Sequence, residues 1–340
     1  MAVVKSNAYG HSLLDFAKEM ETKADWLGVD SVVEGIALRK AGITIPILVL
    51  GYTLPERMQD ARNHNLSVSV STLETLKALA QQKGAHPKFH IKVDTGMHRQ
   101  GFLMADLPDV LGLLTSDDAF KKSFEGLFTH FASAKNPAFP AYTQGQLKEF
   151  KVWKETFEKA GLTFMSHAAA TSGTLLFPES HFDLVRVGMG LYGYWPSFET
   201  GEYLKDKISL SPVLSWKTVI AELKMLPAGS KIGYDCTETL ERDSMVAICP
   251  VGYWHGYSRK LSSIGRVLIR GKRCRVLGRV SMDMLTIDVT DTGAKIEDEV
   301  VLIGSSGKES ITAVDMANLD ETSYYETLTR INPLIKRFFQ

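Results

Sequence analysis

The sequence lacks several features that would place it in a particular class of protein. It has no apolar run approaching the roughly 18 residues that a membrane-spanning helix needs, which argues against a membrane protein. Its three cysteines, Cys236, Cys249 and Cys274, are too few and too scattered for a disulfide framework or a zinc ribbon. We therefore expect no metal, and we expect all three to be small buried residues in strands.

An excess of charge of either sign is also missing. The 39 basic residues balance 39 acidic residues, so the formal net charge is zero. Bulk attraction to nucleic acid or to an anionic membrane is therefore not expected. A small neutral or zwitterionic substrate fits this balance better. The opening residues do not have the pattern of a secretory signal peptide, so we expect a cytoplasmic protein.

The length and composition describe a globular protein with more than one part. At about 150 residues per domain, 340 residues predict about two domains, or one large barrel with an appendage. Hydrophobic residues make up 44% of the chain and charged residues 23%, which is ordinary for a globular protein and ample for a core. No internal repeat and no low-complexity segment interrupts it.

The first part of the chain alternates short apolar runs with amphipathic stretches. Helical patterns lie between the runs, for example over residues 32–40, 73–82 and 144–160. This alternation predicts a parallel sheet, and eight runs are the number that closes a (β/α)8 TIM barrel over residues 1–205. A doubly wound open sheet is the rival, but no G-x-G-x-x-G follows the first run. The eight runs are residues 2–4, 26–29, 46–50, 66–70, 89–93, 124–128, 164–168 and 184–187.

The second part of the chain has a different texture. Runs rich in Val, Ile and Thr are separated by turns that contain glycine, and the next helical pattern comes at residues 312–317. We therefore predict a mostly β C-terminal domain over residues 206–340. Its expected strands are residues 213–223, 245–250, 266–270, 273–277, 284–290 and 300–303.

Polar side chains collect where the barrel strands are expected to end. Barrel enzymes build their sites at the carboxyl ends of the strands. Each residue also has a structural explanation: a lysine there can be a solvated charge, a histidine a hydrogen-bonded filler, and Lys92 with Asp94 an ion pair on one strand face. Their coincidence on one rim favours a site. The residues at this rim are Lys5, Lys92, Asp94, His130, His167 and Arg186.

Lys5 is the most specific of these residues. It ends an apolar run, and a lysine held at the end of a buried strand can have its pKa lowered by desolvation. Such an amine can form a Schiff base with a carbonyl compound, which is either a substrate or pyridoxal phosphate. Tyr9 follows four residues later.

At this point the sequence resembles the alanine racemase family of fold-type III pyridoxal-phosphate enzymes. Residues 2–11 (AVVKSNAYGH) look like the cofactor-lysine motif of that family, and the likeness continues in order along almost the whole chain. The further matching segments are residues 91–99 (IKVDTGMHR), 129–132 (THFA), 186–193 (RVGMGLYG), 233–234 (GY), 251–253 (VGY), 278–283 (GRVSMD) and 324–326 (YYE).

The resemblance implies a two-base racemisation. Lys5 would carry pyridoxal 5'-phosphate and act as one base, and Tyr234 would be the second base on the opposite face of the substrate. In the family this tyrosine comes from the partner subunit, so a homodimer with shared active sites is expected. His130 matches the histidine that contacts the tyrosine. Arg186 matches the arginine at the pyridine nitrogen; a guanidinium only donates, so that nitrogen would stay unprotonated.

The resemblance also implies the binding residues. Arg99 would hold the cofactor's phenolic oxygen and the substrate carboxylate, and Lys92 matches a lysine that is carbamylated in many relatives. Tyr253 and Met282 would border the substrate pocket. The cofactor phosphate would be held by Tyr9, Ser172, Gly188, Met189 and Tyr325, partly through backbone N–H groups.

The sequence departs from the family's commonest pattern in places that leave the proposed catalytic groups present. Family members usually carry a strand and a helix before the lysine, so we expect this chain to be either a natural short form or truncated. The side-chain departures put substrate specificity in doubt, because one methylene shifts discrimination by only about 1–3 kcal/mol. They are Ser281 for a cysteine, Thr171 for an asparagine, Trp254-His255 for Ala-Asp, and His98 for a glycine.

The activity that this resemblance implies is interconversion of L- and D-alanine, which supplies D-alanine for peptidoglycan. Three alternatives stay open on sequence alone. One is a racemase of serine or of broader specificity. Another is a barrel-fold pyridoxal-phosphate decarboxylase, against which Arg186 and Tyr234 argue. The third is a non-enzymatic pyridoxal-phosphate homeostasis protein, which would resemble only the first half of the chain.

Overall fold

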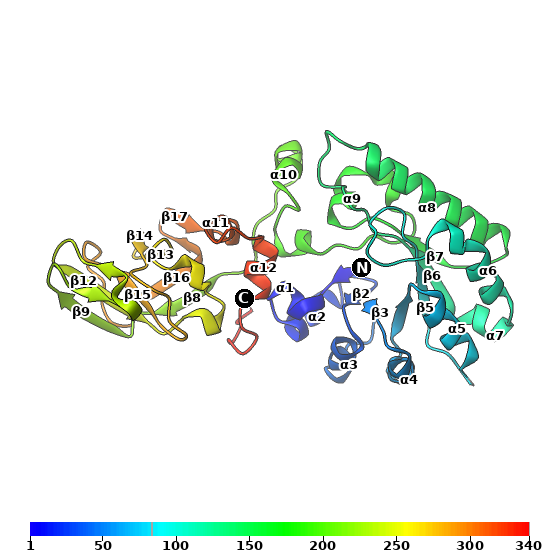
Figure 1. Ribbon diagram of the computed structural model, residues 1–340, viewed down its shortest axis with the longest axis horizontal. Coiled ribbons are helices and arrows are strands. Elements are labelled where there is room, and N and C mark those ends of the chain that lie inside the picture. The colour runs from blue at the N-terminus through cyan, green and yellow to red at the C-terminus, as the bar shows by residue number, and fades with distance from the viewer. Residues whose placement is uncertain (83, 340) are drawn as a thin grey trace. The chain divides into compact units, whose positions relative to one another are not determined.

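The computed structural model describes residues 1–82 and 84–339, and the chain forms two compact units (Figure 1). Unit 1 comprises Met1–Ala8 and Leu13–Pro212. Unit 2 comprises Tyr9–Ser12 and the chain from Val213 onward. Along the chain, the boundary between the two units therefore lies between Pro212 and Val213, a few residues after the boundary expected at residue 205. The roles assigned to the two domains stay predictions.

Unit 1 is built around a parallel sheet whose strands follow one another in chain order. Every neighbouring pair from β1 to β7 is parallel, as the predicted alternation of strands and helices requires. Seven of the eight predicted runs are thereby confirmed as strands. Their bounds are β1 Ala2–Val3, β2 Leu27–Val29, β3 Ile47–Tyr52, β4 Ser67–Val70, β5 Phe89–Lys92, β6 Phe124–Phe128 and β7 Met165–His167.

The eighth run, residues 184–187, closes the sheet into a barrel without forming a full strand. On one side Arg186 N donates to Ala169 O at 2.9 Å, just beyond β7. On the other side Val3 N in β1 donates to Val187 O at 2.8 Å, and Ala2 and Val187 form a parallel bridge. Sequential order and a closed seam confirm the predicted barrel and exclude the doubly wound open sheet.

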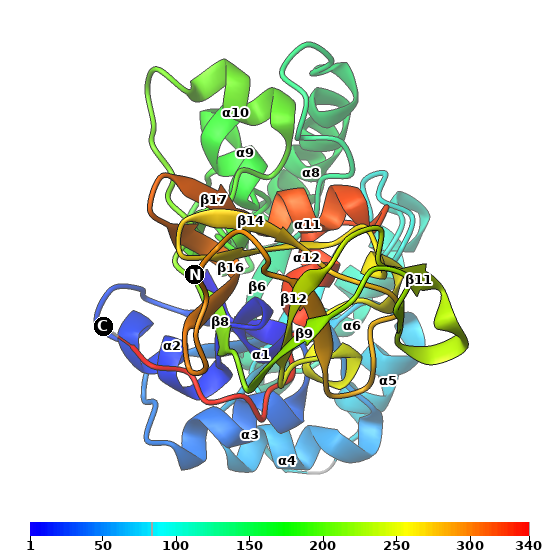
Figure 2. The same ribbon diagram turned by 90° about the vertical axis from the view of Figure 1, so that its left-hand side faces the viewer.

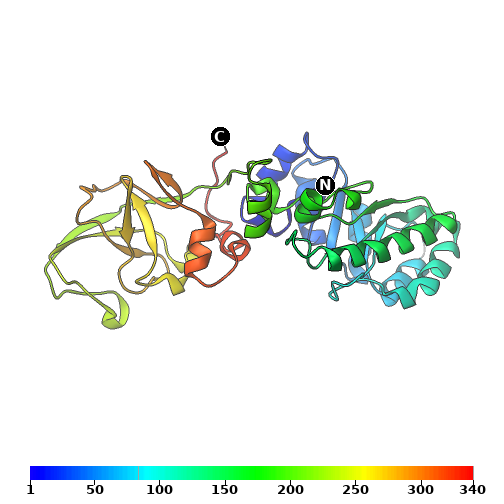
Figure 3. The same ribbon diagram turned by 90° about the horizontal axis from the view of Figure 1, so that it is seen from above.

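Helices connect the strands and cover the outside of the barrel, and Figure 3 shows the long helix α8 in green on the outer side of unit 1. Two starts follow from side-chain caps: Ser31 Oγ accepts from Glu34 N at 3.3 Å, and Thr72 Oγ1 accepts from Thr75 N at 3.2 Å. The helices of unit 1 are α2 Leu13–Met20, α3 Val32–Lys40, α4 Met58–Asn63, α5 Leu73–Gln81, α6 Leu107–Thr115, α7 Asp118–Ser123, α8 Ala141–Lys159, α9 Thr171–Leu176 and α10 Phe198–Leu204.

Aromatic side chains pack α8 onto the barrel. Trp153 and Phe157 of this helix are fully buried, and the ring of Phe157 lies 5.7 Å from that of Phe124 in β6 and 5.8 Å from that of Phe164. Burial of one such ring stabilises the fold by roughly 1.5–3 kcal/mol. This packing fixes the position of β6, which ends two residues before His130.

Unit 2 is mostly β, as predicted, and its strands form three small sheets (Figure 2). The sheet order is β15–β12–β9 in one, β14–β13–β16–β17 with β8 on β16 in another, and β10–β11 in the third. The bounds are β8 Trp216–Val219, β9 Glu222–Leu226, β10 Lys231–Ile232, β11 Glu238–Thr239, β12 Ser244–Cys249, β13 Arg266–Ile269, β14 Lys272–Arg275, β15 Leu285–Asp288, β16 Glu299–Ser306 and β17 Glu309–Ile311. Two helices follow, α11 Ala313–Leu319 and α12 Tyr324–Thr329.

Several sequence expectations for unit 2 need correction. The single strand expected at residues 213–223 is two strands in different sheets, β8 and β9. Cys249 and Cys274 are buried in strands as expected, but Cys236 is exposed and lies in the short helical turn Tyr234–Cys236. Its φ of 52° belongs to a turn and not to a strand. Within the described chain, no helix combines the length and apolarity needed to cross a membrane.

Candidate functional site

Lys5 lies at the carboxyl end of the barrel in an unusual stretch of backbone. It follows Val4 directly after β1, and the segment α1 (Lys5–Tyr9) turns into the left-handed region at Ser6, Asn7 and Ala8, with φ between 51° and 56°. Left-handed conformations are unfavourable by about 1–2 kcal/mol for a residue with a Cβ. A run of them without glycine shows that the surrounding structure dictates the path of the chain beyond the lysine.

Side chains from the next βα unit hold that path. Lys5 Nζ donates to Asp30 Oδ1 at 2.8 Å, and Asp30 comes directly after β2. Glu34 accepts from Ser6 N and from Asp30 N, both at 2.7 Å. A Cβ at Gly51 would overlap the carbonyl oxygen of Asp30, so a glycine is needed there. Lys5 is 35% exposed and ion-paired, so the expected burial of its amine is not observed.

Arg186 lies inside the barrel and is 3% exposed. Its Nη1 contacts His167 Nδ1 at 2.6 Å, and its Nη2 contacts His130 Nδ1 at 3.3 Å and donates to Thr129 O at 2.7 Å. Burial lowers the pKa of Arg186 to about 9, so the guanidinium stays charged at neutral pH. A guanidinium only donates hydrogen bonds, and both contacting imidazole nitrogens must therefore be acceptors.

His130, which contacts this guanidinium, is neutral, and its N–H group points away from Arg186. Because Nδ1 of His130 accepts from Arg186, its proton resides on Nε2. Desolvation lowers the pKa of His130 to about 3, with further lowering by the positive charges of Arg186, Arg99, Lys92 and Lys5. The charges of four predicted cations thus act on one neutral donor. Such a group suits anionic ligands.

Lys92 and Asp94 lie on one face of β5 and its extension. The sequence allowed an ion pair between them, but the closest partner of each is another residue. Lys92 Nζ lies 3.4 Å from Gln100 Oε1, and Asp94 Oδ1 accepts from the backbone N–H groups of Gly96, Met97 and His98 at 2.9–3.0 Å. The carboxylate thereby holds the loop that leads to Arg99. Burial, then the charges of Arg99 and Arg186, lowers the pKa of Lys92 to about 8.

Two helical N-termini adjoin at the residues predicted to hold a phosphate. Ser172 is in the first turn of α9, and Gly188 precedes the short helix η4 (Met189–Tyr192); neither N-terminus has a side-chain cap. Thr171 Oγ1 links them by accepting from Gly188 N at 3.1 Å. Uncapped N–H groups at helix starts favour an anion, so the chemistry of this corner fits a phosphate.

Unit 2 carries the remaining predicted residues. The rings of Tyr9 and Tyr325 pack edge-to-face at 6.2 Å, and Gly10 lies so close to α12 that a Cβ there would overlap Leu328 O. Tyr234 is 68% exposed, beside the ion pair of Arg279 with Asp235 at 2.9 Å.

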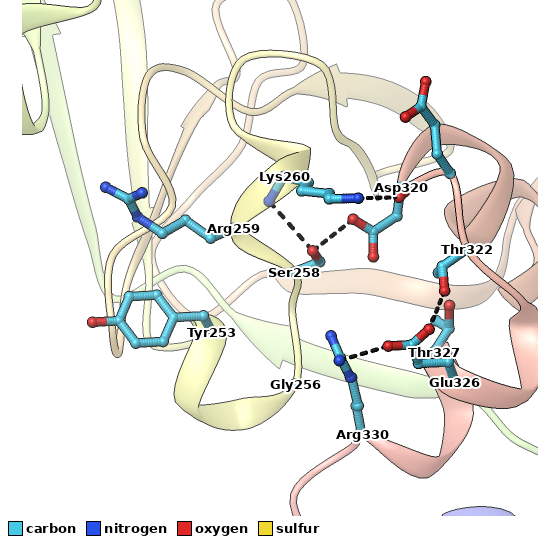
Figure 4. A pocket seen from close by; sticks show the side chains of 11 residues that line it. Tyr253, Gly256, Ser258, Arg259, Lys260, Asp320, Thr322, Glu326, Thr327 and Arg330 are labelled. Atoms are coloured by element: carbon cyan, nitrogen blue, oxygen red, sulfur yellow. Dashed lines mark hydrogen bonds and ion pairs between the residues drawn. The ribbon is translucent and has the colours of Figure 1, made fainter.

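A second group of predicted residues lies elsewhere on unit 2. Tyr253 and Met282 are exposed on adjoining turns, where Tyr253 N donates to Ser281 O at 3.0 Å. Tyr253 also borders a cavity of about 620 Å³ (Figure 4). Two of its charged side chains are bonded within the wall: Asp320 Oδ1 accepts from Ser258 Oγ at 2.7 Å, and Arg330 pairs with Glu326 at 2.5 Å.

Several residues of the barrel site were not among those predicted from the sequence. Asp30 comes directly after β2, and only Val4 separates Lys5 from β1, so the strand-end rule that found Lys5 also finds Asp30. His90 shares a strand face with Lys92 by simple alternation. Glu34 carried no local signal, since it reads as an ordinary first-turn residue of α3. Among residues 1–82 and 84–339, no group of three or more His, Cys, Asp or Glu side chains is arranged to hold a metal.

Comparisons with known proteins match the whole length of the chain. The family model described as "Alanine racemase, N-terminal domain" matches residues 1–196, and "Alanine racemase, C-terminal domain" matches residues 213–339. An alanine racemase of Symbiobacterium thermophilum is 41% identical over 100% of this chain and 90% of its own length. Alanine racemase 1 of Oceanobacillus iheyensis is 36% identical, again over 100% and 90%.

Solved structures agree with these matches. An alanine racemase of Clostridium difficile 630 superimposes with a TM-score of 0.90 at 32% identity, covering 97% of this chain and 86% of that one. The alanine racemase of Bacillus anthracis, solved with bound L-Ala-P, gives a TM-score of 0.89 at 33% identity, covering 97% and 85%.

Proposed function

This chain belongs to the alanine racemase family, and we propose that it interconverts L- and D-alanine with pyridoxal 5'-phosphate as its cofactor. The product of the forward reaction would be the D-alanine used in peptidoglycan. The observation that carries the proposal is the position of Lys5 at the carboxyl end of β1 together with the buried guanidinium of Arg186, which contacts His167 at 2.6 Å and His130 at 3.3 Å. The family match in both units speaks against the single-domain carrier and the decarboxylase alternatives.

The residues of unit 1 fit the cofactor chemically. The two uncapped helix starts at Ser172 and at Gly188-Met189 suit its phosphate, and the buried guanidinium of Arg186 suits a ring nitrogen that accepts a hydrogen bond. Lys5, at the carboxyl end of β1, is suited to bond with the aldehyde of the cofactor. When bound, the cofactor withdraws electrons from the α-carbon of the attached amino acid and so acidifies the α-proton. The assignment of Tyr9 and Tyr325, both in unit 2, to the phosphate stays a prediction from the family resemblance.

Two bases on opposite faces would move the proton. Lys5 is proposed to exchange it on one face and the partner subunit's Tyr234 on the other, which requires a homodimer. The exposure of Tyr234 on unit 2 suits a residue that serves another chain. His130, with its proton on Nε2, would donate to the oxygen of that tyrosine and stabilise its phenolate, since an unperturbed tyrosine has a pKa of about 10.

Arg99 and Lys92 are proposed to bind the substrate end of the site. Arg99 would pair with the substrate carboxylate. Lys92 has a pKa of about 8, so about a tenth of it is uncharged at pH 7. That fraction can add to carbon dioxide and release a proton, giving a carbamate whose negative charge would hold Arg99. Tyr253 and Met282 of the partner subunit would border the side chain of the substrate.

Racemisation and cofactor binding can be tested together. The purified protein, reconstituted with pyridoxal 5'-phosphate, is expected to show an absorbance band that Lys5→Ala removes and that Lys18→Ala, on the surface helix α2, retains. Circular dichroism is expected to show L-alanine losing its signal, with slower change for L-serine, L-lysine and L-arginine. A protein that stays colourless, or one that releases gas from the amino acid without racemising it, would overturn the proposal.

A further inference from the structure

A line of polar side chains crosses the interior of the barrel from its amino-terminal end to Arg186. Glu125, the second residue of β6, lies near the amino-terminal end, where Lys88 Nζ donates to its Oε1 at 2.7 Å. Its Oε2 lies 3.5 Å from His90 Nε2. His90 Nδ1 lies 3.0 Å from His167 Nε2, and His167 Nδ1 lies 2.6 Å from Arg186 Nη1. Both histidines are fully buried.

The position of every proton in this line follows from its two ends. Arg186 donates to His167 Nδ1, so the proton of His167 resides on Nε2. That N–H faces His90 Nδ1, which must therefore accept, and the proton of His90 also resides on Nε2. There it points at the carboxylate of Glu125, which can only accept when ionised. The two hydrogen bonds of the line, from Arg186 to His167 and from His167 to His90, run in one direction. The line ends in a longer polar contact, 3.5 Å between His90 Nε2 and the carboxylate of Glu125.

The surrounding residues are shaped for this line. A Cβ at Gly126 would overlap Nδ1 of His90, so only glycine leaves room for the ring. Trp26 packs edge-to-face against His90 at 5.5 Å, and Phe128 stacks on His167 at 4.7 Å with the planes 4° apart. Ser67 Oγ donates to Glu125 Oε2 at 2.6 Å.

The charges at the lower end agree with this arrangement. The polar contacts with His90, Lys88 and Ser67 outweigh the burial of Glu125 and lower its pKa to about 2, so the acceptor end stays ionised. Burial lowers the pKa of His90 and of His167 below the ordinary value, so both rings stay neutral.

We propose that His90 and Glu125 are positioning residues for Arg186: Glu125 sets the tautomer of His90, His90 sets that of His167, and His167 then holds the guanidinium toward the cofactor ring. The consequence for the cofactor rests on the proposed function, whereas the proton pattern belongs to the apoprotein. Without the carboxylate of Glu125, the Nε2 proton of His90 loses its anionic partner, so the Nδ1-protonated form of His90 becomes more favourable than before. Two N–H groups then oppose each other, and the conflict passes through His167 to Arg186.

Variants at two positions separate this role from simple packing. His90→Phe fills the space but accepts nothing from His167, whereas His90→Asn retains an acceptor oxygen near the Nδ1 position. Glu125→Met removes the acceptor, whereas Glu125→Gln removes the charge and retains an oxygen. Gly126→Ala displaces the ring of His90 without removing any polar group. Glu158→Gln, in a surface ion pair with Lys154 on α8, is the matched control.

The first readout is nitrogen NMR of the apoprotein labelled with ¹⁵N-histidine. At pH 7 the wild type is expected to show His90, His167 and His130 as neutral rings protonated on Nε2. His90→Phe and Glu125→Met are expected to change the signals of His167, and His90→Asn and Glu125→Gln to restore them. A protonated Nδ1 on His90 or His167 in the wild type, or an unchanged His167 in His90→Phe, would overturn the proposal.

The second readout is the holoenzyme. Loss of one hydrogen bond to a charged group predicts about tenfold weaker pyridoxal 5'-phosphate binding and a lower kcat with little change in KM. The same variants are expected to shift the absorbance band of the bound cofactor, which a packing defect alone would leave in place. Cofactor affinity equal to that of Glu158→Gln would contradict the positioning role. A wild type that binds no cofactor would instead refute the proposed function and leave the NMR result standing.

Discussion

The ammonium group of Lys5 lies 2.8 Å from Oδ1 of Asp30, so the residue directly after β2 holds the lysine that follows β1 and Val4. The two side chains come from neighbouring parallel strands, whose carboxyl ends lie at the same edge of the barrel. The pair is partly exposed, at 35% and 52% of the side-chain areas. Its importance is therefore expected to be geometric and not thermodynamic.

Asp30→Asn is expected to separate these two effects. Because exposed ion pairs contribute about 0–1 kcal/mol, the free energy of unfolding should change by less than about 1 kcal/mol. We expect kcat to fall several-fold, since the amine of Lys5 loses its orienting partner. Urea unfolding and racemisation kinetics measure the two quantities. Glu19→Gln, in the surface pair with Lys23, is the control. A kcat equal to that of this control would contradict an orienting role for Asp30.

Stability is expected to fall as the pH is lowered below about 6.5. His130 has a folded pKa of about 3, and burial also lowers the pKa of His90 and His167. Below pH 6.5 the unfolded chain therefore binds protons that the folded chain does not, which destabilises the fold by up to about 1.4 kcal/mol per pH unit for each histidine. Glu125, with a pKa of about 2, adds to this loss below its unfolded value.

Urea unfolding at pH 7.5, 6.0 and 5.0 measures this dependence. A variant with one buried histidine removed, His90→Asn, is expected to show a shallower slope than the wild type. His98→Asn is the control, because His98 is 73% exposed and asparagine tolerates its φ of 52°. A free energy of unfolding that does not change between pH 7.5 and 5.0 would show that the buried rings take up protons without penalty.

Gly10→Ala is expected to destabilise unit 2 more than the strain of its backbone explains. Gly10 and Gly42 have nearly the same φ, 89° and 92°, but a Cβ at Gly10 overlaps Leu328 O, whereas nothing lies within 4 Å of one at Gly42. Both substitutions strain the backbone by about 1 kcal/mol. Only Gly10→Ala should add a steric clash, which moves Tyr9 away from Tyr325. Equal unfolding free energies for the two variants would contradict the close packing on α12.

Thiol reagents are expected to modify a single cysteine in the native protein. Cys236 is exposed, whereas burial raises the pKa of Cys249 to about 12 and that of Cys274 to about 11. The thiolate is the reactive form, so the two buried thiols should react only after unfolding. Mass spectrometry is expected to find one label on the folded protein and three in denaturant. Labelling of Cys249 in the folded state would show that unit 2 opens readily.

The sequence was informative wherever residues are buried in a repeating pattern. Strands covered by helices on one face and by the barrel interior on the other read as continuous apolar runs, so the positions of β1 to β7 could be predicted to within a few residues. α3 occupies the predicted residues 32–40, because Ser31 caps its start. The same pattern located strand ends, and with them Lys5, His130 and Arg186.

Features that depend on contacts distant in the sequence could not be predicted in this way. β10 and β11 have two residues each, too few for any periodicity. The left-handed backbone at residues 6–9 contains no glycine that would have predicted it, and contacts from Glu34 and its neighbours hold it. Glu125 looks like an ordinary polar residue near a strand start. Its role emerges only when β4, β5 and β6 are placed side by side.

The seam of the barrel makes the order of folding a matter of function. Val3 and Val187 join the two ends of unit 1 across 184 residues of chain, so their hydrogen bond is among the slowest contacts to form. Lys5 and Arg186 lie on opposite sides of that seam. A ligand that engages both would act as a clasp, since binding only to the closed form favours closure by mass action. An open barrel would contain every residue of the site but would not bring Lys5 and Arg186 together.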